Sequence, residues 1–406
     1  MNYSKALNIL EVKVSKLTAN ERLTIAALEM LSKTSMANTP SVGIELEFFL
    51  RDGPGGALCT LAQSQTFLHS LSELPQWDIF SRNAESGLIL KVSKSLDSKR
   101  YHTVKYEHPP HMMEVALSYE TNLVKLKDSL ELLFSELHTA AKNTSLAIDI
   151  SLKVEPSKID WDSVREVESR FKPLSDSRKK IFESHTGGNF DHRVDFTHYT
   201  AATQFHIGGI RWWEQAPDFI DKIYRAEFLI SGLPYYEKPS NFQERWSSYR
   251  YVFGEMPLLG FPKISQWSTD EWIGGLLKSP YFEKGFSTFE AAVGGLNDEA
   301  LKIAILSVRD LQIIKPKWIG TLEYRSDPAI PSVELILRLA ALRFGAYLHY
   351  LNPKSKPLMP SSTFEQLSTE WWNGAHTTNH EFEWAILKEI CFEALSSRGF
   401  GEEKFL

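Results

Sequence analysis

The sequence predicts an α+β fold. Segments with apolar residues at every second position predict strands, and segments with apolar residues three or four positions apart predict helices. The two kinds of segment follow one another without the regular strand–helix–strand alternation of a parallel sheet. Several of the strands alternate between apolar and polar residues, which is typical of an antiparallel sheet.

Composition excludes some classes of function. The chain has 406 residues, of which 43% are apolar and 24% charged, values typical of a globular protein. Its net charge of -6 gives no basic surface for nucleic acid. No apolar run approaches the length of a membrane span. The start of the chain lacks the apolar core of a signal peptide, and the two cysteines lie far apart, so we expect a cytoplasmic protein in a reducing compartment.

The first strand is predicted at Gly43–Leu50 and contains two acidic residues. Side chains alternate across a strand, so Glu45 and Glu47 share one face, roughly 7 Å apart along the strand. The other face is apolar. Two like charges this close repel each other unless a cation lies between them. The alternative is the solvated face of an edge strand, and this segment alone does not decide between the two.

The remaining elements divide the chain into three parts. Residues 1–39 predict an N-terminal helical extension, 40–350 a single domain, and 351–406 a C-terminal helical segment packed on that domain. Strands are predicted at 77–80, 87–92, 101–106, 112–117, 146–152, 200–209 and 318–325. Helices are predicted at 62–72, 123–141, 217–230, 298–311, 333–351 and 381–396.

Two segments give no clear element. Residues 155–195 are polar and irregular and include Gly187 and Gly188, which suits either a mobile loop over an active site or a surface excursion. Residues 235–290 are rich in aromatic residues and are interrupted by Pro and Gly, so their structure is not predicted.

Four predicted strands carry polar residues at positions where core strands usually have none. They are Glu45 with Glu47, Glu114 with Glu107 seven residues earlier, Gln204 with His206, and Glu323 with Arg325. If these strands are neighbours in one sheet, five carboxylates and an imidazole project from one face. Such a group requires cations, and its oxygen-rich character suits Mg²⁺ or Mn²⁺. Arg325 beside them could bind a phosphate oxygen, and the combination is typical of phosphoryl transfer.

These four segments resemble, in order, motifs of the glutamate–cysteine ligase family, in its carboxylate–amine ligase branch. The segments are Gly43-Ile44-Glu45-Leu46-Glu47, Lys105-Tyr106-Glu107 with Met113-Glu114-Val115, Thr203-Gln204-Phe205-His206-Ile207-Gly208, and Gly320-Thr321-Leu322-Glu323-Tyr324-Arg325-Ser326-Asp327. The resemblance covers roughly residues 40 to 350. It departs after Glu114, where Val115-Ala116-Leu117-Ser118 replaces the family's Leu-x-Thr-x-Pro.

The resemblance implies a glutamine synthetase-like fold, in which a curved antiparallel sheet forms an open funnel with helices packed outside. It implies a metal-binding set of Glu45, Glu47, Glu107, Glu114, His206 and Glu323. It also implies catalytic roles for Arg325, Glu323 and Glu47, with Arg325 at the transferred phosphate and Arg250 at a substrate carboxylate or the nucleotide.

The function expected from this resemblance is an ATP- and Mg²⁺-dependent ligase, with Mn²⁺ as an alternative metal. It would join an amino acid, with the γ-carboxylate of glutamate as the first choice of donor, to an amine by way of an acyl phosphate. The sequence leaves open whether the protein forms a homo-oligomer. Alternatives are phosphate transfer to a guanidino group or amide formation on a protein side chain by the same fold, a non-catalytic nucleotide-binding module, and a structural protein with salt-bridged strands.

Overall fold

The computed structural model describes most of the chain from residue 39 onward. The described residues are 39–98, 100–107, 109–159, 179, 182–183, 186–188, 199–209, 215, 218–231, 268, 271, 313–316, 321–372 and 380–406. Residues 1–38 of the predicted N-terminal extension, the predicted helix at 298–311 and Arg250 lie outside these residues, as do most of the segments 155–195 and 235–290.

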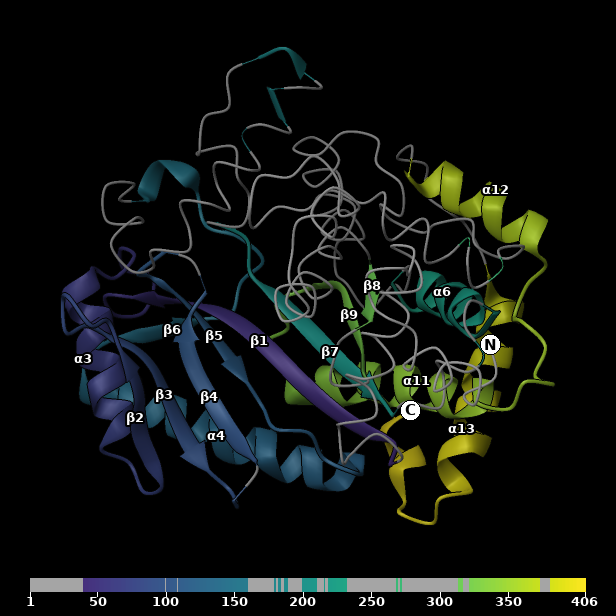
Figure 1. Cartoon of the computed structure of the whole chain (residues 1–406), viewed down its shortest axis with the longest axis horizontal. Coiled ribbons are helices and arrows are strands. Elements are labelled where there is room, and N and C mark those ends of the chain that lie inside the picture. Colours follow the sequence, from purple (N-terminus) through teal and green to yellow (C-terminus); the bar gives the residue numbers. More distant parts are fainter. Residues whose placement is uncertain are drawn as a thin grey trace, which may run out of the picture.

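In the described part of the chain, nine strands and the helices around them form one mixed α+β unit (Figure 1). The strands are β1 (Ser41–Arg51), β2 (Trp77–Arg82), β3 (Ile89–Ser95), β4 (Tyr101–Tyr106), β5 (Met112–Ala116), β6 (Ala147–Asp149), β7 (Ala202–Gly208), β8 (Ile314–Pro316) and β9 (Thr321–Pro328). The helices are α3 (Leu61–Ser72), α4 (Leu123–Asn143), α6 (Asp218–Ser231), α11 (Val333–Tyr350), α12 (Ser361–Trp372) and α13 (Glu381–Ser396), with short 3-10 helices η2 (Pro156–Lys158) and η7 (Glu402–Phe405).

All nine strands belong to one open sheet in which each described pairing is antiparallel. The order is β2-β3-β4-β5-β1-β7-β9-β8, and β6 pairs with the end of β1. This confirms the predicted α+β class and the antiparallel sheet. The first strand is central in this sheet, so its acidic face is not the solvated face of an edge strand. The short strand β8 and the helix α12 were not among the elements predicted from the sequence.

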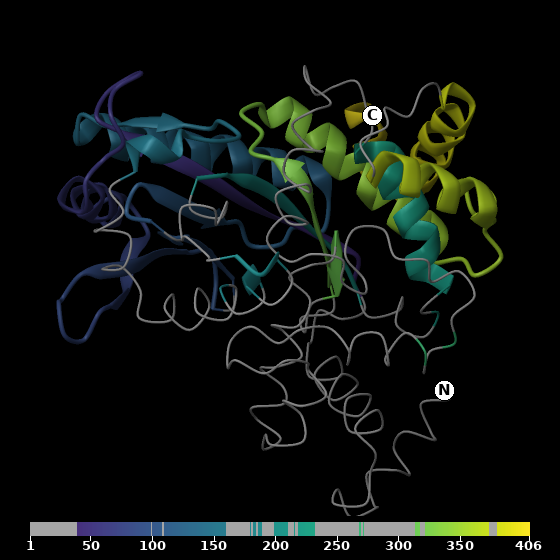
Figure 2. The ribbon, with the colours of Figure 1, turned by 90° about the horizontal axis from the view of Figure 1, so that it is seen from above.

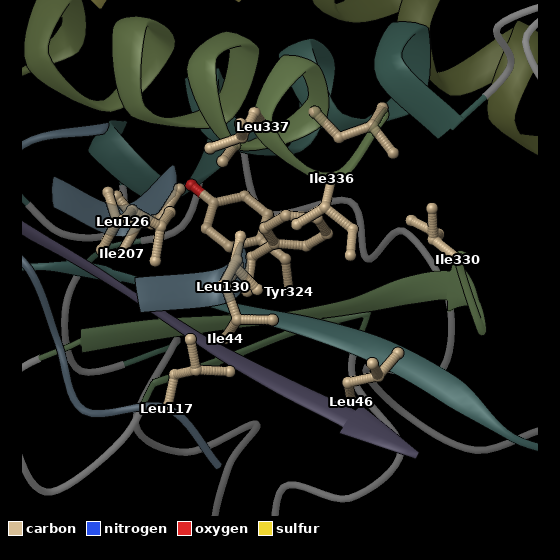
Figure 3. Packing of buried hydrophobic residues seen from close by; sticks show 14 of the residues in the cluster. Ile44, Leu46, Leu117, Leu126, Leu130, Ile207, Tyr324, Ile330, Ile336 and Leu337 are labelled. Carbon is tan, nitrogen blue, oxygen red and sulfur yellow. The ribbon is translucent and has the colours of Figure 1, made fainter. Parts of the chain in front are cut away.

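The helices α3, α4 and α11 pack against one face of the sheet (Figures 1 and 2). The even-numbered residues of β1, from Val42 to Leu50, face these helices and are fully buried in the main core. Figure 3 shows Ile44 and Leu46 of β1 on the side of the sheet where Ile336 and Leu337 of α11 project downward. Because side chains alternate, Glu45 and Glu47 lie on the opposite face.

Local sequence explains the ends of the main helices. Thr60 and Gln63 form a capping box at the start of α3, in which each side chain accepts from the other residue's backbone N–H. Asn122 caps α4 by accepting from the backbone N–H of Lys125. These caps fix where the two helices begin beneath the sheet.

The last part of the chain packs on the same core. α13 lies along α11, and the fully buried Glu402 of η7 accepts a hydrogen bond from the backbone N–H of Leu123, 2.8 Å away, at the first turn of α4. Arg398 donates to the backbone oxygen of Thr121 and pairs with Glu402. The C-terminal segment therefore supplies an anion to the positive end of a helix that supports the sheet. In the described part of the chain, no helix has the length and apolar character needed to cross a membrane.

Candidate active site

Five neighbouring strands bring the predicted polar residues together on the face of the sheet opposite the helices. Glu47 of β1 lies directly opposite Glu114 of β5, and His206 of β7 lies directly opposite Glu323 of β9. Glu45 of β1 lies opposite Gln204 of β7. β4 adds the fifth strand, because Glu107 directly follows its last residue. The sequence order of these residues does not reveal this arrangement, which arises because β1 inserts between β5 and β7.

Glu45, His206 and Glu323 form the first of two compact groups, which we call triad A. One ligand atom from each lies within 4.8 Å of the others. His206 Nε2 is 3.2 Å from Glu45 Oε1, and Arg325 Nη1 is 3.4 Å from Glu323 Oε1. Neither ring nitrogen of His206 makes a hydrogen bond within the described part of the chain. A buried imidazole in this state retains a lone pair that could coordinate a cation.

Glu47, Glu107 and Glu114 form the second group, triad B, with ligand oxygens also within 4.8 Å of one another. Lys105 places a basic side chain at this triad, with its Nζ 3.1 Å from Glu114 Oε1 and 3.8 Å from Glu107 Oε2. The two acids of the first strand, Glu45 and Glu47, therefore belong to different triads. Their adjacent positions on one face of β1 make the triads neighbours.

Hydrogen bonds from β7 fix the carboxylate of Glu47. Its Oε2 accepts from the backbone N–H of Ala202 at 2.8 Å, and its Oε1 accepts from the Gln204 side chain at 3.1 Å. A carboxylate oxygen has two lone-pair directions, so an oxygen that accepts one hydrogen bond can also coordinate a cation. Glu47 is thus oriented by its neighbours while it can still coordinate a cation in triad B.

A bulge in β9 sets the direction of the side chains that follow Glu323. Phe205 pairs with Tyr324 and Thr203 pairs with Asp327, so β9 has one residue more than β7 between these two pairs. A bulge of this kind changes which face the following side chains occupy. Arg325 lies beside Glu323, whereas Asp327 lies opposite Thr203 and is directed to the core face.

A buried charged network lies on the core face beneath this bulge. Arg343 of α11 is fully buried, with its Nη1 2.7 Å from Asp327 Oδ2 and its Nη2 2.6 Å from Glu227 Oε1. Ser326 also hydrogen-bonds to Glu227 and to Arg343. Burial raises the pKa of Glu227, and Arg343 opposes this rise. The network attaches the strand that carries Glu323 and Arg325 to α6 and α11.

The electrostatics of the two triads fit divalent cations. Burial, followed by the negative charge of Glu114, holds the pKa of Glu107 well above its ordinary value, and Lys105 only partly opposes this shift. Among the described residues of this face, five carboxylates lie with the basic side chains of Lys105 and Arg325, so negative charge exceeds positive charge there. The oxygen ligands of Mg²⁺ lie about 2.0–2.1 Å from the ion, so opposite ligands are about 4 Å apart. In each triad the ligand atoms lie within 4.8 Å of one another, which is compatible with such a coordination sphere. The donor set therefore suits one hard cation per triad.

The geometry brings all six predicted metal-binding residues and Arg325 onto one face, whereas Arg250 lies outside the described residues. Sequence reasoning missed the contacts of Lys105 and the hydrogen bond from Gln204 to Glu47. The strand alternation of residues 101–106 offered a signal for the first, because it directs Lys105 to the same side as the acids. The fold and this face together define a protein with a candidate divalent-cation and phosphate-binding site.

Comparisons with known proteins give distant structural similarity. No protein-family model matches the chain, and no curated protein does. The glutamate–cysteine ligase of Francisella tularensis, solved in complex with AMP, aligns with a TM-score of 0.43 and 10% identity over 91% of this chain and 82% of that chain. A bifunctional glutathione synthetase from Pasteurella multocida aligns with a TM-score of 0.39 and 11% identity over 95% of this chain and 47% of that one.

The first of these proteins bears the name of the family that the sequence motifs resemble. This chain spans about half the length of the second protein. Similarity this distant leaves the function to be argued from the residues of the site.

Proposed function

We propose that this chain is an ATP- and Mg²⁺-dependent carboxylate–amine ligase of the glutamate–cysteine ligase type. One observation carries the proposal: two oxygen-rich triads and Arg325 share one face of a single sheet. The order of the four motifs in the sequence supports the same class. The donor would be an amino acid, with the γ-carboxylate of glutamate as the first choice, and the acceptor an amine.

Triad A and triad B would hold the cations. Divalent cations bound there, Mg²⁺ or Mn²⁺, would neutralise the phosphate oxygens of ATP and of the group in transfer. Arg325 presents a planar donor group that can bind two phosphate oxygens, and Glu323 holds it in place through their ion pair. Glu47 contributes a carboxylate whose direction is fixed before any ligand binds.

The proposed reaction has two steps, phosphorylation of the carboxylate and attack by the amine. A carboxylate oxygen of the donor attacks the terminal phosphorus of ATP, and ADP leaves, giving an acyl phosphate. The amine then attacks the acyl carbon, and phosphate leaves with the oxygen that the carboxylate supplied. The amine loses a proton, and an amide remains. Arg325 would stabilise the negative charge that develops on the phosphate in both steps.

The test is ADP release by the purified protein with ATP and Mg²⁺, against amino acids with and without added amines, followed by mass spectrometry. Release that requires glutamate and cysteine, together with the mass of their condensation product, supports the parent activity. Release that requires another pair of substrates would assign a different acceptor or a different phosphoryl-transfer reaction to the same site. Nucleotide binding without release under any condition would contradict the proposal and favour a regulatory module.

Variants locate the activity in the triads. Glu45→Ala and Glu323→Ala should each lower kcat by about 10²-fold or more, because each removes a charged group that would act in the transition state. Glu73→Ala is the matched control, since Glu73 is an exposed acid at the end of α3, remote from this face. Full activity in either triad variant would refute the cation role.

A further inference from the structure

Lys105 occupies an unusual position for a basic side chain at a proposed cation site. It projects from β4 directly opposite Glu114 of β5, and its ammonium group is within ion-pair distance of two of the three carboxylates of triad B. Lys105 is 28% exposed, whereas the Glu114 side chain is only 7% exposed. A pair in such partly buried surroundings is less screened than a surface pair.

The cross-strand row that contains Lys105 explains the direction of its side chain. Lys91 of β3 lies directly opposite Lys105, and Glu114 lies opposite it on the other side. Two lysines side by side repel each other, which favours a conformation of Lys105 directed away from Lys91 and towards the acids. Lys91 is in turn placed over the ring of Phe80, 4.8 Å from its centre. The sheet thus directs one of the two ammonium groups into triad B.

We propose that Lys105 is a tethered cation of triad B, which a divalent cation must displace in order to bind. This inference rests on the cation role proposed above for Glu47, Glu107 and Glu114. An ammonium group and a metal ion compete for the same Glu114 oxygen, because both require its lone pairs. Lys105 neutralises part of the charge of the triad before cation binding and lowers the affinity of the triad for the cation.

Displacement is sterically simple. A lysine ammonium is a point charge on a four-carbon stem with rotatable bonds, so it can move without any change in the strand. Once displaced, it remains tethered at the edge of the site as a positive group beside the bound ion. Lys105 would therefore set the concentration of Mg²⁺ or Mn²⁺ at which triad B is filled.

The first experiment measures Mn²⁺ affinity by calorimetry, with stoichiometry from electron paramagnetic resonance, in the complete protein. Lys105→Met should bind Mn²⁺ about tenfold more tightly or better at one site, because it removes a competing positive charge about 3–4 Å from the ligand oxygens. Lys105→Arg should restore the weaker binding. Lys91→Met is the matched control, which removes the same charge one strand further away and should change the affinity far less.

A double-mutant cycle assigns the effect to triad B. In a Glu114→Gln background, which removes the charge of the contested oxygen, Lys105→Met should tighten Mn²⁺ binding far less than it does in wild type. If wild type binds Mn²⁺ and Lys105→Met leaves the affinity unchanged or weaker, this inference is wrong while the proposed function stands. If wild type binds no divalent cation at all, both are wrong.

A second measurement needs no substitution. The rate at which an acetylating reagent modifies each lysine is followed by peptide mass spectrometry with and without saturating Mg²⁺. Displacement should raise the rate at Lys105 several-fold, because its ammonium is released from Glu114, and should leave the rate at Lys91 unchanged. An acetylation rate at Lys105 that does not rise with Mg²⁺ would overturn the inference. Because this measurement uses the wild-type protein, it also applies if Lys105→Met fails to fold.

Discussion

At the scale of single residues, the site depends on the alternation of side chains along a strand. Glu45 and Glu47 are separated by one residue, share a face, and join different triads because β1 has a different neighbour on each side. A shift of one residue in register would direct both acids into the apolar core. The fully buried Ile44 and Leu46 oppose such a shift.

Glu107 gives the first prediction at this scale. Its pKa is raised, so the cation-free folded state binds a proton here more readily than the unfolded chain does. The stability contributed by that proton is present below the ordinary glutamate pKa and is lost as pH rises through the raised value. Glu107→Gln should therefore stabilise the cation-free protein at pH 8, on the order of 1 kcal/mol or about 2–4 °C in Tm.

The same substitution should reduce the stabilisation that Mg²⁺ confers, because it removes a ligand of triad B. Thermal unfolding of wild type and Glu107→Gln, each with a chelator and with Mg²⁺, measures both effects. A lower Tm in the chelator for Glu107→Gln would show that Glu107 has a purely structural role.

His102 gives a prediction about acid stability. Burial, followed by the positive charges of Lys94 and Arg100, lowers its pKa to about 4, and its Nδ1 accepts from the backbone N–H of Ser118. A lowered histidine pKa contributes stability above the unfolded value of about 6.5, and this stability is lost as pH falls towards 4.

His102→Asn should therefore make the free energy of unfolding less dependent on pH between 6.5 and 4. Urea unfolding at several pH values measures this slope. The exposed His69 on α3 supplies the control His69→Asn, which should leave the slope as in wild type. An unchanged slope in His102→Asn would contradict the assigned cause.

At the scale of elements, the close packing of α11 and α13 depends on one glycine. A Cβ at Gly345 would lie 2.6 Å from the Cβ of Cys391 and 2.7 Å from its Cα. Gly345→Ala gains helix propensity of about 1 kcal/mol but forces the two helices apart, which costs about 1–3 kcal/mol. We predict net destabilisation in denaturant unfolding, and a stabilised Gly345→Ala protein would show that the helices can separate without cost.

The buried charged network beneath the bulge in β9 gives a second prediction about how the elements are held together. Arg343→Met leaves Glu227 and Asp327 buried without their cation, and this should cost about 3–5 kcal/mol. Methionine keeps an unbranched apolar stem and removes the guanidinium group, so most of the loss can be assigned to the missing charge and its hydrogen bonds. Denaturant unfolding measures it, with the exposed Arg82→Met on β2 as control; a loss below about 1 kcal/mol would mean that the acids are protonated in the fold.

At the scale of the whole molecule, the sequence predicted most of the framework and the members of the site, but not their grouping. Periodicity identified the strands from Gly43 to Tyr106 and the long helices, because apolar spacing and caps are local signals. The partition into triads depends on strand order, which is set by the long-range pairing of β1 with β5 and β7. The bulge at Arg325 and the burial of Arg343 within an apolar helix are likewise tertiary features.

The central claim is that ATP phosphorylates the carboxylate of the donor on this face of the sheet. The most direct test uses glutamate labelled with ¹⁸O in its γ-carboxylate, or the donor found in the ADP-release assay, and follows the label into the phosphate product by mass spectrometry. The account predicts one ¹⁸O atom in each phosphate released, and loss of both label transfer and turnover in Glu323→Ala. Phosphate whose new oxygen comes only from water would contradict the account, because it would mean hydrolysis of ATP without an acyl phosphate.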